Sequence, residues 1–328
     1  MTFSNVLSAV GQTPLIRLSR VLGGLPFNLY GKMEGLNPGG SMKDRSALYI
    51  LQNALREGKV FPGGLVVESS SGNMGIGLAQ ACNYFGLQFV CVVDPKTTTQ
   101  NLSILRAYGA VIEMVAKPDP VTNEYLPARL QRVRDILDAN EGSYWPNQYG
   151  NRWNPEAHSQ HTMREIDEAL EGHVDMVFCP TSTCGLVTGC SSYFRARGRS
   201  TKVIAVDALG SVIFSKVKAT RRIPGMGAGK RSDLYRDGMA DGHVCVSDLE
   251  CVQGCRHLVG EESILAGGSS GGAVMAVDRM RDQIPAGSNC VVILCDRGER
   301  YLDTVYDDDW VEKYLGEVPM MAQEAVMA

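Results

Sequence analysis

Short apolar runs alternate with longer amphipathic segments along most of the chain. In the first half, β-rich runs at 64–70, 87–95 and 111–116 flank helical patterns at 72–86 and 97–110. This alternation is typical of βαβ units. The runs are continuously apolar, as expected for parallel strands that are covered on both faces. The pattern therefore predicts an α/β protein built on mainly parallel sheets.

A second series of strand-like runs, at 175–182, 202–208 and 289–296, follows an irregular stretch, SYWPNQYGNRWNP. This break predicts two domains, each with a mainly parallel sheet flanked by helices. We expect an N-terminal domain at 1–147, a C-terminal domain at 148–316 and a weakly ordered tail at 317–328. Residues 221–241 form a further irregular segment, which the sequence leaves open as a mobile loop over a site or a surface connection.

Composition and charge narrow the class of protein. With 44% hydrophobic and 21% charged residues, the chain has the composition of a globular enzyme. A net charge of −4 without a basic run gives no reason to expect nucleic acid or a membrane surface as a partner. No signal peptide and no apolar run of about 20 residues is visible, so we expect a cytoplasmic protein with reduced thiols. Cys251 and Cys255 lack zinc-site spacing, and no metal is expected.

The stretch NPGGSMKDR, residues 37–45, places Lys43 where a helix is about to begin. One interpretation is an ordinary turn, with Ser41 as the helix N-cap and Lys43 in a solvated first turn. The other is functional, because the positive end of a helix dipole disfavours an ammonium group. A lysine kept as an amine can form a Schiff base with a carbonyl cofactor and can transfer protons.

Three more glycine-rich turns follow predicted strands, where open α/β sheets bind ligands. ESSSGNMG offers backbone N–H groups suited to a carboxylate, CPTSTCGLVTG could surround a phosphate, and AGGSSGG could place a serine against a cofactor ring. Each turn alone could be a simple helix cap. None is a Walker loop or a GxGxxG fingerprint, so a nucleotide-binding oxidoreductase is not favoured.

Taken in order, NPGGSMKDR, SSGNMG, STCGLVTG, GGSSGG and CDRGERYL resemble the fold-type II pyridoxal-phosphate (PLP) enzymes, the cysteine synthase and cystathionine β-synthase group. The resemblance runs from residue 10 to residue 302. It implies PLP as cofactor, a fold like that of the tryptophan synthase β chain, and a homodimer.

The resemblance also implies roles for individual residues. Lys43 would carry PLP and move the Cα proton, and Asn73 would bind the cofactor's 3-hydroxyl group. Ser269 would face the pyridine nitrogen. The phosphate would be held by Ser182, Thr183, Cys184, Gly185 and Leu186. The substrate α-carboxylate would be bound by Ser70, Ser71, Gly72 and Gln148, and the phosphoserine or glutamate end by Arg129, Tyr149 and Ser182.

Further segments, among them YGAVIEMVAKPD, YWPNQYGN and GERYLDTVYDDDW, are similar to family members that join O-phospho-L-serine to L-glutamate. Such enzymes begin the production of 2,3-diaminopropionate for a siderophore. The implied reaction is a β-replacement through an α-aminoacrylate. The small amino-acid substrates would then be O-phospho-L-serine and L-glutamate.

Two alternatives remain open. A cysteine synthase that uses O-acetylserine or O-phosphoserine with sulfide would share the same motifs, and a non-catalytic PLP-binding regulatory partner is an alternative of another class. The chain also departs from the cysteine synthase pattern. Met74 stands where those enzymes usually have threonine, and Cys184 and Leu186 stand where glycine or threonine is usual.

Overall fold

The computed structural model describes residues 2–316. The chain forms two compact units. Unit 1 comprises Met1–Gln12 and Asn37–Thr162, and unit 2 comprises Thr13–Leu36 and Met163–Ala328. The tail expected at 317–328 lies outside the described residues.

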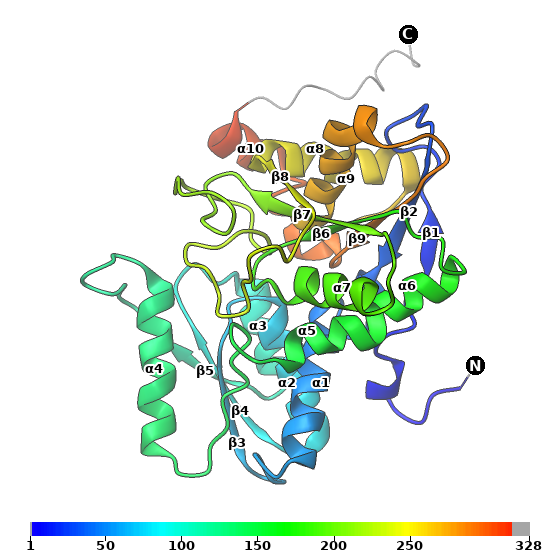
Figure 1. Ribbon diagram of the computed structural model, residues 1–328. Coiled ribbons are helices and arrows are strands. Elements are labelled where there is room, and N and C mark those ends of the chain that lie inside the picture. Colours follow the sequence, from blue (N-terminus) through cyan, green and yellow to red (C-terminus); the bar gives the residue numbers. More distant parts are fainter. Residues whose placement is uncertain (1, 317–328) are drawn as a thin grey trace. The chain divides into compact units, whose positions relative to one another are not determined.

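Unit 1 is built on a parallel three-stranded sheet in the order β3-β4-β5. Its regular elements are η1 (Leu7–Ala9), α1 (Lys43–Arg56), β3 (Leu65–Ser69), α2 (Asn73–Phe85), β4 (Gln88–Val93), α3 (Thr99–Ala107), β5 (Val111–Met114), α4 (Tyr125–Ala139), α5 (Trp153–Ala157) and a π-helical segment (His158–Met163). Figure 1 shows α1 and α2 beside one face of this sheet and α4 beside the other.

Alternation along β3 explains the two layers of unit 1. Val66 belongs to the larger apolar cluster with residues of α1 and α2, whereas its neighbour Val67 packs with Val92 and with Val133 of α4. Successive side chains of a strand point to opposite faces, so a continuously apolar strand requires cover on both sides. The expectation drawn from the apolar runs is met in this sheet.

Unit 2 contains a six-stranded sheet in the order β1-β2-β9-β6-β7-β8, in which only the β1–β2 pair is antiparallel. Its elements are β1 (Leu15–Arg17), β2 (Asn28–Met33), η2 (Glu34–Leu36), α6 (Arg164–Ala169), β6 (Met176–Pro180), α7 (Gly185–Ala196), β7 (Lys202–Ala208), β8 (Gly242–Val246), α8 (Asp248–Glu262), α9 (Gly268–Met280), η4 (Arg281–Gln283), β9 (Asn289–Leu294), η5 (Gly298–Tyr301) and α10 (Asp308–Leu315). In Figure 1, α8 and α9 lie on one side of this sheet and α7 on the other.

The units do not follow the simple division expected after residue 147. Residues 143–162 stay with unit 1, where Tyr144 pairs with Val66 alongside β3. Thr13–Leu36 belongs to unit 2, because β2 pairs in parallel with β9 over its whole length, from Asn28 opposite Asn289 to Met33 opposite Leu294. The chain therefore starts in one unit, contributes two strands to the other and returns.

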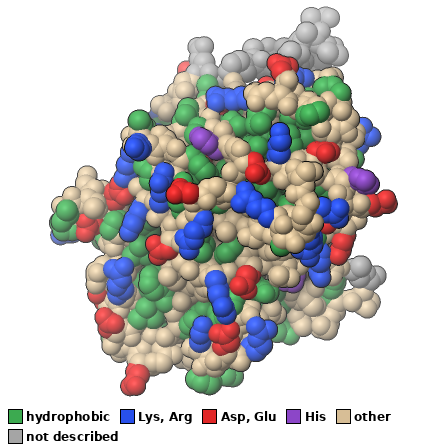
Figure 2. All heavy atoms as spheres, viewed as in Figure 1, with side chains coloured by type: hydrophobic (Ala, Val, Ile, Leu, Met, Phe, Trp, Pro, Cys, Tyr) green, Lys and Arg blue, Asp and Glu red, His purple; other side chains and the backbone are tan. Residues whose placement is uncertain are grey.

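All ten cysteines are free, and burial raises the pKa of thiols such as Cys91 to about 12. Among residues 2–316, no helix combines the length and apolar character that crossing a membrane requires. On the face drawn in Figure 2, acidic and basic side chains are interspersed.

Candidate active site

Lys43 is the first residue of α1, as the sequence predicts, although the N-cap position falls on Met42 rather than on Ser41. Ser41 still contributes, since its Oγ accepts a hydrogen bond from the Lys43 backbone N–H at 3.2 Å. The glycines before it allow close packing. A Cβ on Gly39 would stand 2.6 Å from Oδ1 of buried Asp44, and Gly40 has φ +85°. The packing of this turn therefore fixes the position of Lys43 at the start of α1.

The helices that begin with Lys43 and Asn73 pack directly on each other. Gly77 of α2 makes this possible, because a Cβ there would lie 3.0 Å from the Ala47 Cβ and 3.2 Å from the Lys43 carbonyl oxygen. Met74, on the same helix, is buried in the unit 1 core, with its Sδ 3.8 Å from the Ser46 hydroxyl. Met74 is thus a packing residue at this helix contact.

The turn of Ser70, Ser71 and Gly72 connects β3 to α2. The Ser70 Oγ accepts a hydrogen bond from the Gly75 N–H at 2.9 Å, and the Asn101 side-chain amide donates to the Ser71 carbonyl at 3.0 Å. A Cβ placed on Gly72 would meet no atom within 4 Å, so the turn faces open space. A helix start next to such space suits an anionic group.

Gln148 lies against this turn. Its Nε2 donates to the Ser69 carbonyl oxygen at 3.0 Å, and its own carbonyl accepts from the Asn154 side chain at 2.8 Å. The backbone N–H of Gln148 donates to Glu68 Oε2 at 3.1 Å. The structure therefore places Gln148 against Ser69, the residue that precedes the Ser70–Gly72 turn.

Arg129 and Tyr149 also belong to unit 1. Arg129 is only 8% exposed, and its Nε lies 3.3 Å from Asp94 Oδ2. Its Nη1 is buried without a hydrogen-bond partner among residues 2–316. Burial raises the pKa of Tyr149 to about 12, while the Arg129 charge acts in the opposite direction. A buried guanidinium with a spare donor is able to receive an anion.

The turn that precedes α7 carries the predicted phosphate-binding residues of unit 2. Cys184, at φ +67°, is the N-cap of α7, and Gly185 and Leu186 open the helix. Burial raises the pKa of the Cys184 thiol to about 11, so the thiol is neutral and does not repel an anion. Hydroxyl groups of Ser182 and Thr183 together with the start of a 12-residue helix form a donor set that fits a phosphate group.

The irregular segment at 221–241, which the sequence left open as a loop over a site or a surface connection, packs on this turn. The Gly227 N–H donates to the Thr181 carbonyl at 2.7 Å, and the Ser232 hydroxyl donates to the Thr183 carbonyl at 2.6 Å. Ser269, in the first turn of α9, is 3% exposed, and a Cβ on Gly225 would lie 3.7 Å from its Oγ. The segment thus borders both predicted cofactor-contacting elements of unit 2.

Two titratable residues of unit 1 were not identified from the sequence as part of this region. Burial lowers the pKa of His158 well below its ordinary value, and the charges of Lys43 and Arg45 act in the same direction. Glu68, fully buried, follows three apolar residues in the run LVVES, and a charged residue in an otherwise apolar strand was the available signal.

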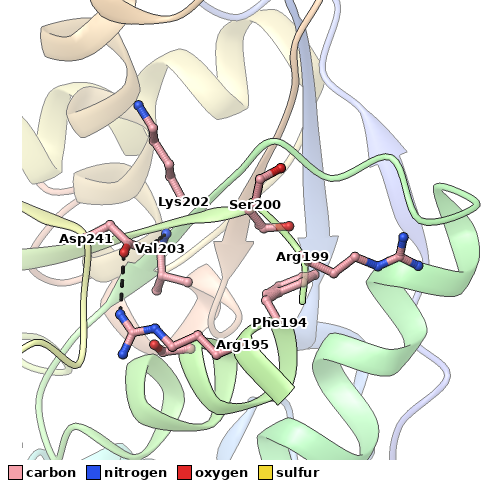
Figure 3. A pocket seen from close by; sticks show the side chains of 9 residues that line it. Phe194, Arg195, Arg199, Ser200, Lys202, Val203 and Asp241 are labelled. Atoms are coloured by element: carbon pink, nitrogen blue, oxygen red, sulfur yellow. Dashed lines mark hydrogen bonds and ion pairs between the residues drawn. The ribbon is translucent and has the colours of Figure 1, made fainter. Parts of the chain in front are cut away.

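A separate pocket of about 380 Å³ lies in unit 2, between the end of α7 and the start of β7 (Figure 3). Arg195 and Asp241 face each other across it at 3.4 Å, whereas Arg199 and Lys202 point away from this pair. None of the predicted site residues lines this pocket.

Comparisons with known proteins agree with the motifs. N-(2-amino-2-carboxyethyl)-L-glutamate synthase from Ralstonia nicotianae is 43% identical over 313 residues, which cover 95% of this chain and 92% of that protein. The solved structure of O-ureido-L-serine synthase is 26% identical, with a TM-score of 0.88 and full coverage of both chains. The O-acetylserine dependent cystathionine β-synthase from Helicobacter pylori is 27% identical, with a TM-score of 0.86 over 93% of this chain and 98% of that one.

These neighbours confirm the predicted fold-type II architecture. The match to the family described as "Pyridoxal-phosphate dependent enzyme" spans residues 6–296, and it confirms both the predicted cofactor and the prediction of an enzyme. The chain therefore belongs to the pyridoxal-phosphate dependent enzyme family.

Proposed function

We propose that this enzyme joins O-phospho-L-serine to L-glutamate and releases inorganic phosphate. The amine of glutamate would replace the phosphate at Cβ, giving N-(2-amino-2-carboxyethyl)-L-glutamate. The observation that carries the proposal is the 43% identity, over 95% of the chain, to a synthase with that product in its name. The product contains a 2,3-diaminopropionate unit, so the reaction would be the first step towards that amino acid for a siderophore or another natural product.

The residues present fit the cofactor. Lys43 would hold PLP through its Nζ, Asn73 would bind its 3-hydroxyl group, and Ser182–Leu186 would hold its phosphate. Ser269 would meet the pyridine nitrogen with a neutral hydroxyl group rather than a carboxylate. When bound, PLP supplies an aldehyde for the substrate amine and a conjugated ring that withdraws electrons from Cα.

Lys43 would also act on the substrate. Its Nζ would take the proton from Cα of phosphoserine and return a proton there after glutamate has been attached. The contact of α2 with the Lys43 carbonyl oxygen supports this role, because it fixes the start of α1. Proton transfer is efficient only when the base is held within reach of the substrate atom.

Apart from Ser182 of unit 2, the residues proposed to hold the substrate's charged groups belong to unit 1. Ser70, Ser71, Gly72 and Gln148 would bind the α-carboxylate, in keeping with the open space at Gly72. Arg129 would stabilise negative charge on the phosphate leaving group or a glutamate carboxylate, because its buried Nη1 has a donor to spare. Tyr149, which lies in the electrostatic reach of Arg129, would complete this contact, with Ser182 as a further candidate.

The experiment is a direct comparison of substrates. Purified PLP-loaded enzyme is given O-phospho-L-serine with L-glutamate, with sulfide, or with neither, and O-acetyl-L-serine replaces phosphoserine in a parallel set. Phosphate release is measured together with the mass of the product. Formation of the glutamate adduct supports the proposal, whereas cysteine formed only with sulfide would assign a cysteine synthase, and no turnover would favour a regulatory PLP-binding protein.

We further propose that two copies of the chain associate and that the protein acts in the cytoplasm, as the family resemblance implies. Size-exclusion chromatography with light scattering measures the mass in solution. A monomer mass near 35.6 kDa at working concentration would contradict the dimer.

A further inference from the structure

Glu68, the fourth residue of β3, has no solvent exposure, and three donors converge on its carboxylate. Oε1 accepts hydrogen bonds from the Ser69 N–H at 2.8 Å and from the Trp145 indole Nε1 at 3.2 Å, and Oε2 accepts from the Gln148 N–H at 3.1 Å. Two of these donors belong to the segment that follows α4. Glu68 therefore ties residues 145–148 to the strand that leads into Ser70.

The same segment is attached to β3 at its other end. Tyr144 donates from its N–H to the Leu65 carbonyl at 2.8 Å and accepts from the Val67 N–H at 2.9 Å. The backbone ladder thus covers the first half of β3, and Glu68 is the side chain that continues the attachment to the point where the strand ends. Without that carboxylate, Gln148 would be linked to this end of β3 through its Nε2 bond to Ser69.

The chemistry of the donors identifies the state of Glu68 in this arrangement. All three partners are N–H groups, and an ionised carboxylate is an acceptor on both oxygens. A protonated carboxyl keeps acceptor capacity on both oxygens, but without its negative charge it is a weaker acceptor for all three N–H groups. The three hydrogen bonds are therefore strongest when Glu68 is ionised.

The surroundings oppose that ionisation. Burial raises the pKa of Glu68 to about 7, against its three hydrogen bonds and the Arg129 charge. The other titratable groups that interact with it are Cys91 of β4, opposite Glu68 in the sheet, and the phenols of Tyr144 and Tyr149. Burial keeps all three of these groups neutral, so Arg129, paired with Asp94, is the cation that acts on Glu68.

We propose that Glu68 is a positioning residue whose ionised carboxylate holds Trp145 and Gln148 beside the Ser70–Gly72 turn, so that this turn takes the substrate carboxylate. The proposal rests on the proposed function only in that it uses the same carboxylate site. Glu68 itself touches neither substrate nor cofactor in this assignment. Its protonation would weaken the hydrogen bond from the Gln148 N–H and loosen the site.

The first arm of the test needs no ligand. In ¹H–¹⁵N spectra, the indole N–H of Trp145, assigned with Trp145→Phe, should shift with a midpoint near pH 7 in the wild type, because its acceptor gains or loses charge. Glu68→Gln should abolish this shift. The matched control is Glu113→Gln on β5, whose carboxylate binds Arg132 at 2.8 Å and which should leave the Trp145 titration unchanged. A Trp145 signal that does not titrate in the wild type would overturn the proposal.

The second arm separates positioning from general damage. At about pH 8, Glu68→Gln should raise KM for O-phospho-L-serine roughly five-fold or more with kcat changed less than about two-fold, as expected for a loss of binding alone. An unchanged KM would contradict the proposal. If the wild type does not turn over phosphoserine and glutamate, the proposed function fails and the indole titration decides the role of Glu68. If Glu68→Gln does not fold, the titration of the Trp145 indole N–H in the wild type decides the role of Glu68.

Discussion

Gly77 lies so close to the backbone of Lys43 that a Cβ added at Gly77 would stand 3.2 Å from the Lys43 carbonyl oxygen. The contact sets the distance between the helices that begin with Lys43 and with Asn73. Close approach of two helix backbones is a use for which glycine has no substitute, because every other residue adds a Cβ. The position of the lysine thus depends on a residue more than thirty positions away.

Gly77→Val should therefore separate α1 from α2. Overpacking of this kind costs about 1–3 kcal/mol of unfolding free energy, and we expect turnover to fall as well, because the start of α1 moves. Urea unfolding and phosphate release measure the two effects. Gly23→Val is the control, since a Cβ there meets nothing within 4 Å, and its stability should change by less than about 0.5 kcal/mol. Equal effects of the two substitutions would refute the role given to Gly77.

Met74→Thr restores the residue that cysteine synthases usually have. Because Met74 is 3% exposed and packs against Ser46, the shorter side chain should leave a cavity and lower the unfolding free energy by about 2–4 kcal/mol. We expect no tighter binding of the substrate carboxylate. Met74→Leu keeps most of the volume and should cost less than about 1.5 kcal/mol. Tighter phosphoserine binding by Met74→Thr would show that the hydroxyl group reaches the substrate after all.

The parallel α/β architecture and the helix starts at Lys43, Asn73 and Gly185 were predictable from the sequence, because continuous apolar runs and glycine-rich turns are local signals. The strands at Leu15–Arg17 and Asn28–Met33 were not predicted. Both are short, and β2 owes its place to pairing with β9, some 260 residues further along the chain. Pairing between strands that lie far apart in the sequence gives no signal in the local pattern of hydrophobic residues.

In the candidate site, too, some features were predictable from the sequence and others were not. The turn residues could be proposed because backbone geometry and residue type coincide in short motifs. The position of residues 221–241 could not be predicted, since it depends on single hydrogen bonds such as that from the Gly227 N–H to the Thr181 carbonyl oxygen. Glu68 stood in the predicted strand, but its three partners come together only once residues 143–150 lie along β3. Assignment of the individual roles remains a prediction.

Lys43→Ala should reduce turnover by at least about 1,000-fold, because the proposed function gives Lys43 both the holding of the cofactor and the transfer of the proton. The fold should survive, because the contacts of Lys43 with Ser41, Ser46 and Gly77 involve its backbone. Thermal unfolding and phosphate release test these two statements. Lys43→Arg keeps the positive charge without a usable amine and should be equally inactive. Activity near the wild-type rate in either variant would remove Lys43 from the mechanism.

Glu68 should make the protein less stable as the pH rises. Its folded-state pKa is about 7 against an ordinary value of 4.5, so the folded chain binds more protons between these values. Unfolding free energy then decreases from about pH 4.5 upwards, by about 3 kcal/mol in total once the pH is above 7. Urea unfolding across this window measures the slope. Glu68→Gln should remove that contribution, and an unaltered slope would show that the carboxyl titrates normally.

His158 should contribute a slope of the opposite sign. Burial and the neighbouring Lys43 and Arg45 hold its pKa well below 6.5, so the unfolded chain binds the proton more readily. The stability due to neutral His158 is present above about pH 6.5 and is lost progressively as the pH falls below it. His158→Gln should therefore flatten the loss of unfolding free energy on the acid side, whereas His173→Gln, at an exposed position, should leave it as it is. Because the two slopes oppose each other between about pH 4.5 and 6.5, measuring the Glu68 and His158 variants over the same buffers separates them. A steeper acid-side loss in His158→Gln would mean that the buried imidazole is charged and paired in the folded protein.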